Sequence, residues 1–422
     1  MADLRYQPIN LGRWLLWGAT AALFVVAPLA FPHGFALTMM TQMGAFIIFA
    51  LSYNMLLGQG GMLSFGHAVY SGLGAYFAVH ALNMIGKGTL VFPVMLLPLI
   101  GGLAGLAFGV IFGYVTTKKA GTTFAMISLG IGELVHACVL MFPGFFGGEG
   151  GVQTNRVVGH PFLGITFGPA IQVYYLVAFW CFVCMIAMFA LTQTPLGRMA
   201  NAVRDNPERA EFVGYDTQKI RFLQLTLAGF FAGVSGALSC INFEIVTDEN
   251  VSALRSGGVL IATFIGGTGF FFGPILGSVV FIFFVVALSG FTQAWLLYLG
   301  LFFLAMVLYA PGGIASLIMM QLPVIRARRF GALLVPYLLA LAAGMVAFAG
   351  LVGVVEMVYR LSDQSLDTQM TLFGIGFDAK SAPPWIAFSL LLAAGIAALA
   401  FASRHVGERW GAIQNRIQGT PP

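Results

Sequence analysis

Residues 196–221 read LGRMANAVRDNPERAEFVGYDTQKIR, and this stretch is densely charged in a chain that is otherwise almost entirely apolar. Asn206 suits the N-cap of a helix, and Pro207 suits the first helical position, where its missing N–H is not needed. Glu208 favours the positive end of the helix dipole, and Gly214 supplies a left-handed stop. The pattern predicts a helix of about two turns, which is too short to be stable alone and must be held by its neighbours.

One face of this short helix carries Arg209, Phe212 and Val213 at positions i, i+3 and i+4. A cation and two apolar groups on one face indicate a surface that meets a partner. Phe212 is the expected anchor, because an apolar ring can fill a pocket on that partner. The alternative is an ordinary solvated loop between two membrane helices.

The composition places this segment in a polytopic membrane protein. The chain has 422 residues, of which 59% are hydrophobic and 8% are charged, and these values exclude a string of soluble domains. A bilayer-spanning helix needs about 20 mostly apolar residues. We therefore expect an all-α fold with twelve spans, of which the short eighth is a partial or tilted crossing, at residues 12–31, 36–57, 66–84, 90–116, 121–142, 170–193, 221–241, 254–268, 273–290, 292–310, 332–353 and 385–403.

Lysine and arginine mark the cytoplasmic side of a membrane protein. With the N-terminus inside, only five of the 20 cations fall outside, namely Lys87, Arg156, Arg255, Arg360 and Lys380. This asymmetry predicts that both termini and residues 196–221 are cytoplasmic. The first apolar run ends without a small-x-small cleavage site, so we expect it to remain as a span and not to be a cleaved signal peptide.

Glycine predicts helix packing in one place and a break in another. A four-residue period removes side chains from one stripe of the fourth span and allows another backbone to approach closely, at Gly101, Gly105, Gly109 and Gly113. Residues 58–67, GQGGMLSFGH, are too rich in glycine to continue a helix. Broken backbone at membrane depth is tolerated only where protein or a water-filled cavity covers it. A simple helix hairpin is the alternative.

Glu208, Arg209 and Ala210, followed by Gly214, resemble the E-A-A-x-x-x-G cytoplasmic loop of ABC importer permeases, with Arg209 in place of the first alanine. The wider string at residues 197–216 is similar to that of the branched-chain amino acid importer family. Further strings resemble this family at residues 52–76, 266–273 and 310–314. The resemblance covers roughly residues 11–320.

The resemblance implies a ten-helix importer permease core at residues 1–320, with a coupling loop at 196–221. Residues 321–422 depart from the pattern and form an extension with two predicted membrane helices. In this family the coupling loop docks on the ATP-hydrolysing subunit, which implies that role here for Asn206, Pro207, Glu208, Arg209, Ala210, Phe212 and Gly214.

The implied function is the permease subunit of an ATP-driven importer for branched-chain amino acids or related small polar solutes. The implied partners are two ATP-binding subunits, a second homologous permease subunit and a periplasmic or extracellular binding protein, in the inner membrane of a bacterium. ATP and magnesium would bind the partner ATPase subunits. The chain lacks a G-x-x-x-x-G-K-[ST] string, so we expect neither a cofactor on it nor an enzyme, and we expect no nucleic acid partner.

Glu133 is the only acidic residue within a predicted span, and a carboxylate there is costly enough to be a functional candidate. His136 follows on the same face. Either Glu133 is neutral and hydrogen-bonded to another helix, or the pair borders the substrate path, for which Gln59 and Ser64 of the glycine-rich string are further candidates. An ion-coupled secondary transporter that uses Glu133 is the alternative function.

The four cysteines fall inside apolar runs and are expected to be packing residues, not disulfides or metal ligands.

Overall fold

The computed structural model describes residues 11–158, 166–326, 330–362 and 368–418. Both chain ends, together with Arg5, Arg328 and Arg329 of the charge argument, lie outside these residues. The described chain is helical apart from two small antiparallel sheets, which pair β1 (Val152–Gln153) with β2 (Ile245–Val246) and β3 (Gln369–Leu372) with β4 (Ile375–Asp378). Its contacts separate two compact units, unit 1 at residues 1–288 and 301–315 and unit 2 at 289–300 and 316–422.

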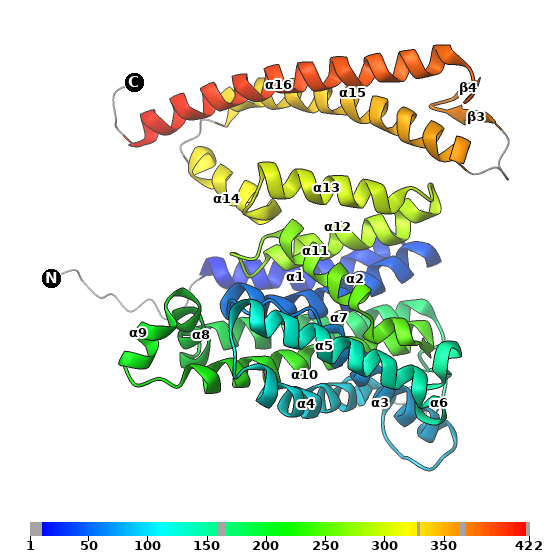
Figure 1. Ribbon diagram of the computed structural model, residues 1–422, viewed down its shortest axis with the longest axis vertical. Helices are drawn as coiled ribbons and strands as arrows, with labels where there is room; N and C mark the ends of the chain where they lie inside the picture. Colours follow the sequence, from blue (N-terminus) through cyan, green and yellow to red (C-terminus); the bar gives the residue numbers. More distant parts are fainter. Residues whose placement is uncertain (1–10, 159–165, 327–329, 363–367, 419–422) are drawn as a thin grey trace. The chain divides into compact units, whose positions relative to one another are not determined.

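Unit 1 holds most of the helices (Figure 1). A π-helical turn, η1 (Met55–Gln59), continues the second of them, and α13 (Trp295–Tyr309) contributes residues to both units. The remaining helices of unit 1 are α1 (Leu11–Ala30), α2 (Gly34–Asn54), α3 (Ala68–Gly86), α4 (Leu97–Thr116), α5 (Gly121–Met141), α6 (Pro143–Phe146), α7 (Ala170–Gln193), α8 (Pro195–Asp205), α9 (Pro207–Phe212), α10 (Thr217–Phe243), α11 (Ala253–Gly266) and α12 (Gly273–Ile282).

The glycine stripe of α4 packs directly on α10. A Cβ atom added at Gly105 would lie 2.2 Å from the carbonyl oxygen of Gly229, and one added at Gly101 would lie 2.6 Å from that of Gly233. No side chain fits at these distances, so the two backbones are in contact. The predicted packing role of the stripe is confirmed.

The main apolar core of unit 1 lies between α2, α3, α7 and α10. Cys181 and Cys184 are buried in it, and the Sγ atom of Cys181 lies 3.8 Å from the Sδ atom of Met185. These two cysteines therefore pack as small apolar residues, as predicted.

Eight described helical segments are long and apolar enough to cross a membrane, or up to nine if α13 and α14 (Gly313–Arg326), which meet at 45°, are one span. The chain is thus an all-α polytopic membrane protein. Three predicted spans correspond to helices outside this set. Two of them, α1 and α11, have short apolar segments, and α3 carries His80 and Asn83 within its 19 residues. The count of twelve stays a prediction.

Unit 2 pairs α15 (Gly331–Ser362) with α16 (Ala382–Gln418), and the β3–β4 hairpin lies between them in the chain. The two helices approach closely, because a Cβ atom added at Gly350 would lie 2.4 Å from the Leu392 nitrogen. A small apolar cluster of Val324, Leu333 and Ile413 closes one end.

The helix α15 extends beyond the predicted span at 332–353, so Glu356 also lies within a candidate membrane helix. The expectation that Glu133 is the only acidic residue in a span stays a prediction, because α15 is longer than a span requires and Glu356 lies past the predicted end at residue 353. Glu356 accepts hydrogen bonds from the Thr292 hydroxyl at 2.7 Å and the Tyr298 hydroxyl at 3.1 Å. These bonds offset the cost of burying its polar group, and the helix continues past the end of the apolar run.

Candidate functional site

The short helix α9 has the predicted ends. The Asn206 side chain accepts a hydrogen bond from the Arg209 backbone nitrogen at 2.9 Å, which caps the first turn. Gly214 follows the helix with φ of +95°, a left-handed conformation that a residue with a side chain rarely adopts. The predicted cap and stop are confirmed.

One side of α9 is held by its neighbours. Ala210 is buried in a small apolar cluster with Ala200 and Val203 of α8 and Ile220 of α10. The Thr217 hydroxyl donates a hydrogen bond of 2.8 Å to the Glu211 carboxylate. These contacts explain how a helix of only six residues is stable, since it cannot be stable by itself.

The carboxylate of Asp216 caps the start of α10 by accepting a hydrogen bond from the Lys219 backbone nitrogen at 3.0 Å. This bond to the charged form holds the pKa of Asp216 below its ordinary value. The chain therefore passes from α9 into α10 through a second capped turn.

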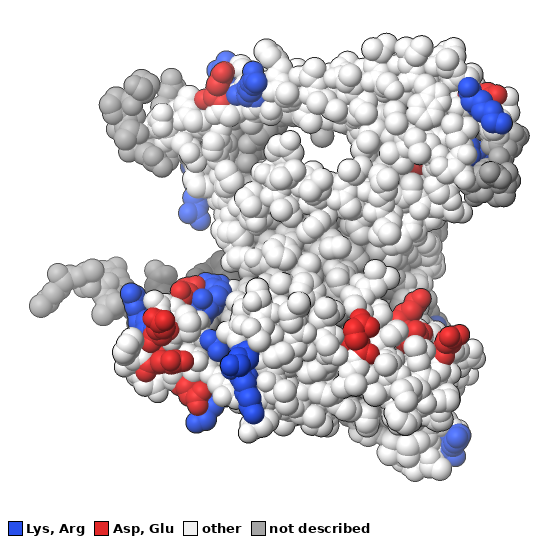
Figure 2. All heavy atoms as spheres, viewed as in Figure 1, with Lys and Arg blue, Asp and Glu red and all other residues white. Residues whose placement is uncertain are grey.

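The opposite side of α9 faces outward. Phe212 is 91% exposed and Val213 is 71% exposed, and Arg209, Glu208 and Pro207 are exposed beside them. Figure 2 shows a group of mixed charged side chains where α8 and α9 lie in Figure 1, with other charged groups elsewhere on a mostly uncharged surface. An exposed aromatic ring within a charged surface is typical of a contact with another protein.

The predicted break between two helices is also present. After η1 the chain leaves the helical path, Gly61 takes φ of +63°, and α3 begins only at Ala68. Ser64 and His67 are buried, and a hydrogen bond of 2.9 Å joins the His67 Nε2 and Ser52 Oγ atoms. Protein therefore covers the broken backbone, as membrane depth requires.

Two long polar side chains bond to the backbone at this break. Arg204 of α8 donates from Nη1 to the carbonyl oxygen of Gly58, and Gln224 of α10 donates from Nε2 to the carbonyl oxygen of Met55. Both carbonyls belong to the π-helical turn, where the regular α-helical bonding pattern is interrupted. Arg204 of the charged segment and Gln224 of α10 thus bond directly to the helix break.

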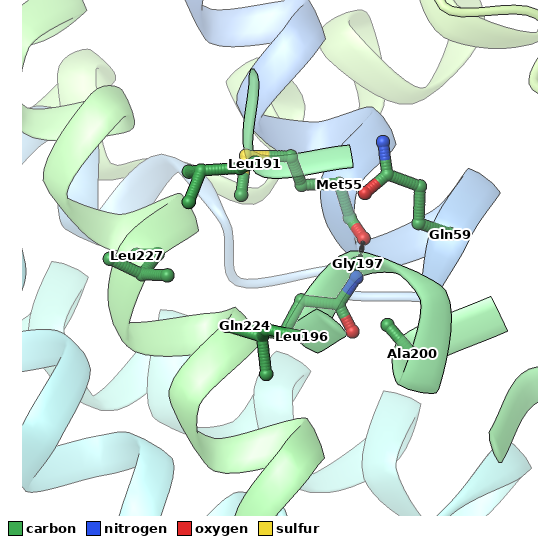
Figure 3. A pocket seen from close by; sticks show the side chains of 8 residues that line it. All are labelled: Met55, Gln59, Leu191, Leu196, Gly197, Ala200, Gln224 and Leu227. Atoms are coloured by element: carbon green, nitrogen blue, oxygen red, sulfur yellow. Dashed lines mark hydrogen bonds between the residues drawn. The ribbon is translucent and has the colours of Figure 1, made fainter. Parts of the chain in front are cut away.

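Gln59 lines a small pocket beside this contact (Figure 3). The pocket lies between η1, α7, α8 and α10, and Figure 3 shows the Gln224 amide directed at the Met55 carbonyl. Its remaining walls are mainly apolar. The full lining is Met55, Gln59, Leu191, Leu196, Gly197, Ala200, Gln224 and Leu227.

Glu133 lies on an exposed face of α5, and no hydrogen bond or ion pair joins it to another helix within the described chain. His136 instead lies 3.9 Å from the carboxylate of Asp248. The helix break packs on the same stretch of α5, because a Cβ atom added at Gly132 would lie 3.4 Å from the Gly66 Cα atom. The structure therefore brings the four path candidates to adjacent segments, while their contact with a substrate stays a prediction.

Sequence reasoning did not select Arg204 or Gln224 as site residues. Their partners are 146 and 169 positions away along the chain, and no local pattern connects them. A glutamine inside an otherwise apolar span is the signal that would have identified Gln224, since such a group needs a hydrogen-bond partner.

Comparison with known proteins gives consistent matches. The family model described as "Branched-chain amino acid transport system / permease component" matches residues 35–311, a range that includes the helix break and α9. The high-affinity branched-chain amino acid transport system permease protein LivM of Escherichia coli is 26% identical over 298 residues, covering 66% of this chain and 69% of the relative.

Two further relatives are more distant. The probable branched-chain amino acid transport permease protein LivM of Methanocaldococcus jannaschii is 23% identical over 321 residues, covering 64% of this chain and 90% of the relative. The fructose import permease protein FrcC of Rhizobium meliloti is 23% identical over 224 residues, covering 48% and 59%. No solved structure matches the chain.

Proposed function

Because the chain belongs to the family of permease components of branched-chain amino acid transport systems, we propose that it is the membrane subunit of an ATP-driven importer of branched-chain amino acids. The chain is a permease subunit and not itself an enzyme. The cargo is carried over from the names of its relatives, and related small polar solutes are the wider class.

The observation that carries this proposal is the outward face of α9. Phe212 is exposed although the helix that bears it is capped at its start and packed on α8 and α10 through Ala210. A fixed helix that presents an apolar ring to solvent is built to enter a cleft on a partner. We assign that partner as an ATP-hydrolysing subunit, which would bind ATP and magnesium.

The complete importer would contain two ATP-binding subunits, this chain, a second homologous permease subunit and an external binding protein. We propose that the chain has twelve spans in the bacterial inner membrane, ten of them in the core, with both termini cytoplasmic. In this arrangement α9 faces the cytoplasm, where the ATPase subunits lie.

The test is reconstitution of this complex in proteoliposomes. A tagged ATPase subunit should retain the permease chain during purification, and uptake of L-leucine should require internal ATP and the loaded binding protein. Uptake that collapses with the proton gradient while ATP is plentiful would instead favour the secondary transporter that uses Glu133.

We propose that residues 321–422 are accessory to transport, because the family match ends at residue 311. Truncation near residue 322 should leave part of the ATP-dependent uptake. The Glu356→Gln variant of the full chain is the matched control, since it weakens the bonds to Thr292 and Tyr298 without removing α15 and α16. Complete loss of uptake in a truncated but normally assembled complex would place the extension within the mechanism.

A further inference from the structure

We propose that Arg255 binds the carboxylate group of the transported amino acid, at a site midway across unit 1. This inference rests on the proposed function and adds to it a residue and a chemical group. Three observations support it. They are the position of Arg255 relative to the middle of two membrane spans, the guanidinium donors that have no hydrogen-bond partner, and the two helices that begin beside it.

The depth of the site follows from its contacts with two membrane spans. The Arg255 guanidinium carbon lies 5.7 Å from the centre of the Phe49 ring. Phe49 lies in the middle part of the span Gly34–Gln59, 15 residues after its start and 10 residues before its end. At about 1.5 Å per residue, these separations are about 22 Å and 15 Å.

The second span gives the same depth. The Phe65 backbone nitrogen donates to the Ser128 hydroxyl at 3.1 Å, and Gly66 packs between Ser128 and Gly132 in the middle of α5. Three residues on from Phe65, the Ala68 backbone nitrogen donates to the Ser256 hydroxyl at 3.0 Å. Ser256 is the residue after Arg255, so the start of α11 lies level with the middle of both spans. The distribution of lysine and arginine along the sequence instead predicts that Arg255 lies on the outer side of the membrane.

The guanidinium group of Arg255 has donors to spare. Its Nη1 atom donates to the Asn250 side-chain oxygen at 2.7 Å, while its Nε atom is buried and has no hydrogen-bond partner. Neither Asp248 nor Glu249, the carboxylates of the preceding turn η4 (Asp248–Val251), forms an ion pair with it in the described chain. An arginine keeps its charge when it is buried, and its planar fork matches a carboxylate with two parallel hydrogen bonds.

The surrounding backbone also favours an anion. The helices α11 and α3 have 14 and 19 residues, and the hydrogen bond between Ala68 and Ser256 brings their N-terminal ends together. Each such end carries partial positive charge, and helices that begin at mid-membrane direct this charge at anionic groups of transported substrates. His67, fully buried at the start of α3, stacks on Phe49 at 5.4 Å and has an unpartnered Nδ1 atom.

These features identify the ligand by its chemistry. A partly buried cation that forms no ion pair among the described residues, beside two helix N-termini, is suited to a small molecule with a carboxylate and not to an uncharged sugar. The buried Phe49 ring lies next to the cation, and this apolar neighbour suits an amino acid with a hydrocarbon side chain.

The test uses the whole complex in proteoliposomes, with L-leucine as the probe. Arg255→Met should lower ATP-driven uptake at least about tenfold, while ATP hydrolysis stimulated by the leucine-loaded binding protein stays within about twofold of wild type. Arg255→Lys keeps the charge but not the planar fork, so its uptake should be intermediate. Lys87→Met, which removes an exposed cation after α3, is the matched control and should transport normally.

Two results would overturn the assignment. One is uptake in Arg255→Met within about twofold of wild type. The other is a parallel loss of uptake and stimulated ATP hydrolysis in an assembled complex, which would make Arg255 a structural residue. If Arg255→Met does not assemble, Arg255→Lys decides by the same two measurements. Absence of ATP-driven leucine uptake in the wild-type complex would refute the proposed function itself and is thereby distinguished from these results.

Discussion

Apolar side chains are usually buried and polar side chains are usually exposed. The outward face of α9 departs from the first half of this rule, and the helix break at residues 58–67 departs from the second half. At α9 an aromatic ring is 91% exposed among charged groups. At the break, polar groups such as His67, Ser64 and Gln224 are buried within an apolar unit. Apolar exposure has a cost that a protein partner removes, whereas polar burial has a cost that internal hydrogen bonds offset.

The two regions therefore obtain their stability from different sources. We propose that a second protein covers the exposed face of α9, so substitutions there should affect assembly first. The break is held from within the chain by Arg204 and Gln224, so its substitutions should affect transport in complexes that still assemble. Four variants test this division.

The largest effect is expected for Phe212→Ala. Loss of an anchor ring should release the ATPase subunit or lower uptake at least about tenfold, as measured by retention on the tagged ATPase and by leucine uptake. Phe291→Ala is the matched control, because Phe291 is also 87% exposed but is distant in sequence from the coupling segment. Full ATPase retention and full uptake in Phe212→Ala would remove the main support for the importer.

Arg204→Met should produce a smaller and different defect. The variant leaves the Gly58 carbonyl without its charged donor, and a lost bond to a charged group should lower uptake by about three- to tenfold. ATPase retention should stay normal. Arg198→Met removes an exposed arginine from the same helix and should transport as wild type. Equal behaviour of the two variants would show that the bond to Gly58 has no role in transport.

Glu133→Gln tests whether an exposed residue of α5 belongs to the path beside the break. If it does, the neutral variant should assemble normally and transport about threefold less, since an intramembrane carboxylate is functional by default. Glu149→Gln, which changes an exposed carboxylate on the turn after α6, provides the comparison. Unchanged uptake in Glu133→Gln would make the residue part of the surface alone.

The smallest effect concerns Asp216, whose folded pKa is held down by its bond to the Lys219 nitrogen. A carboxyl with a depressed folded pKa stabilises the fold above its unfolded pKa of about 4, and this contribution is lost as pH falls through the folded value. Hydrogen exchange at the start of α10 should therefore accelerate, by about twofold, only below about pH 4. Asp216→Asn keeps a capping oxygen and should lose this pH dependence; an identical acid response would refute the assignment.

Local interactions explain which features the sequence predicted. The cap at Asn206, the stop at Gly214 and the bounds of α7 depend on residues close together in the chain, and all three agree with the structure. The covered helix break was predicted in the same way, from glycine content.

The remaining features depend on tertiary contacts. The Arg204 bond to Gly58 and the Gln224 bond to Met55 join segments that are distant in the sequence. The Thr292 and Tyr298 hydroxyl groups donate hydrogen bonds to Glu356, and α15 therefore continues beyond the apolar residues that predicted its span. The proposed depth of Arg255 rests on the hydrogen bond that joins the starts of α3 and α11. Charge counting along the sequence contains no information about this tertiary contact.

The helix α10 extends from the segment that carries α9 across unit 1. It begins five residues after α9 ends, continues for 27 residues without a break and ends next to β2 on the far side of unit 1. Its length is about 40 Å, and Gly229 and Gly233 rest on the backbone of α4, where no flexible side chain can absorb a displacement. We therefore expect a push delivered at Phe212 to act on one end of a stiff helix. If the proposed ATPase subunit docks there, its movement should reach the segment after α10 that contains Asn250 of η4 and Arg255 of α11.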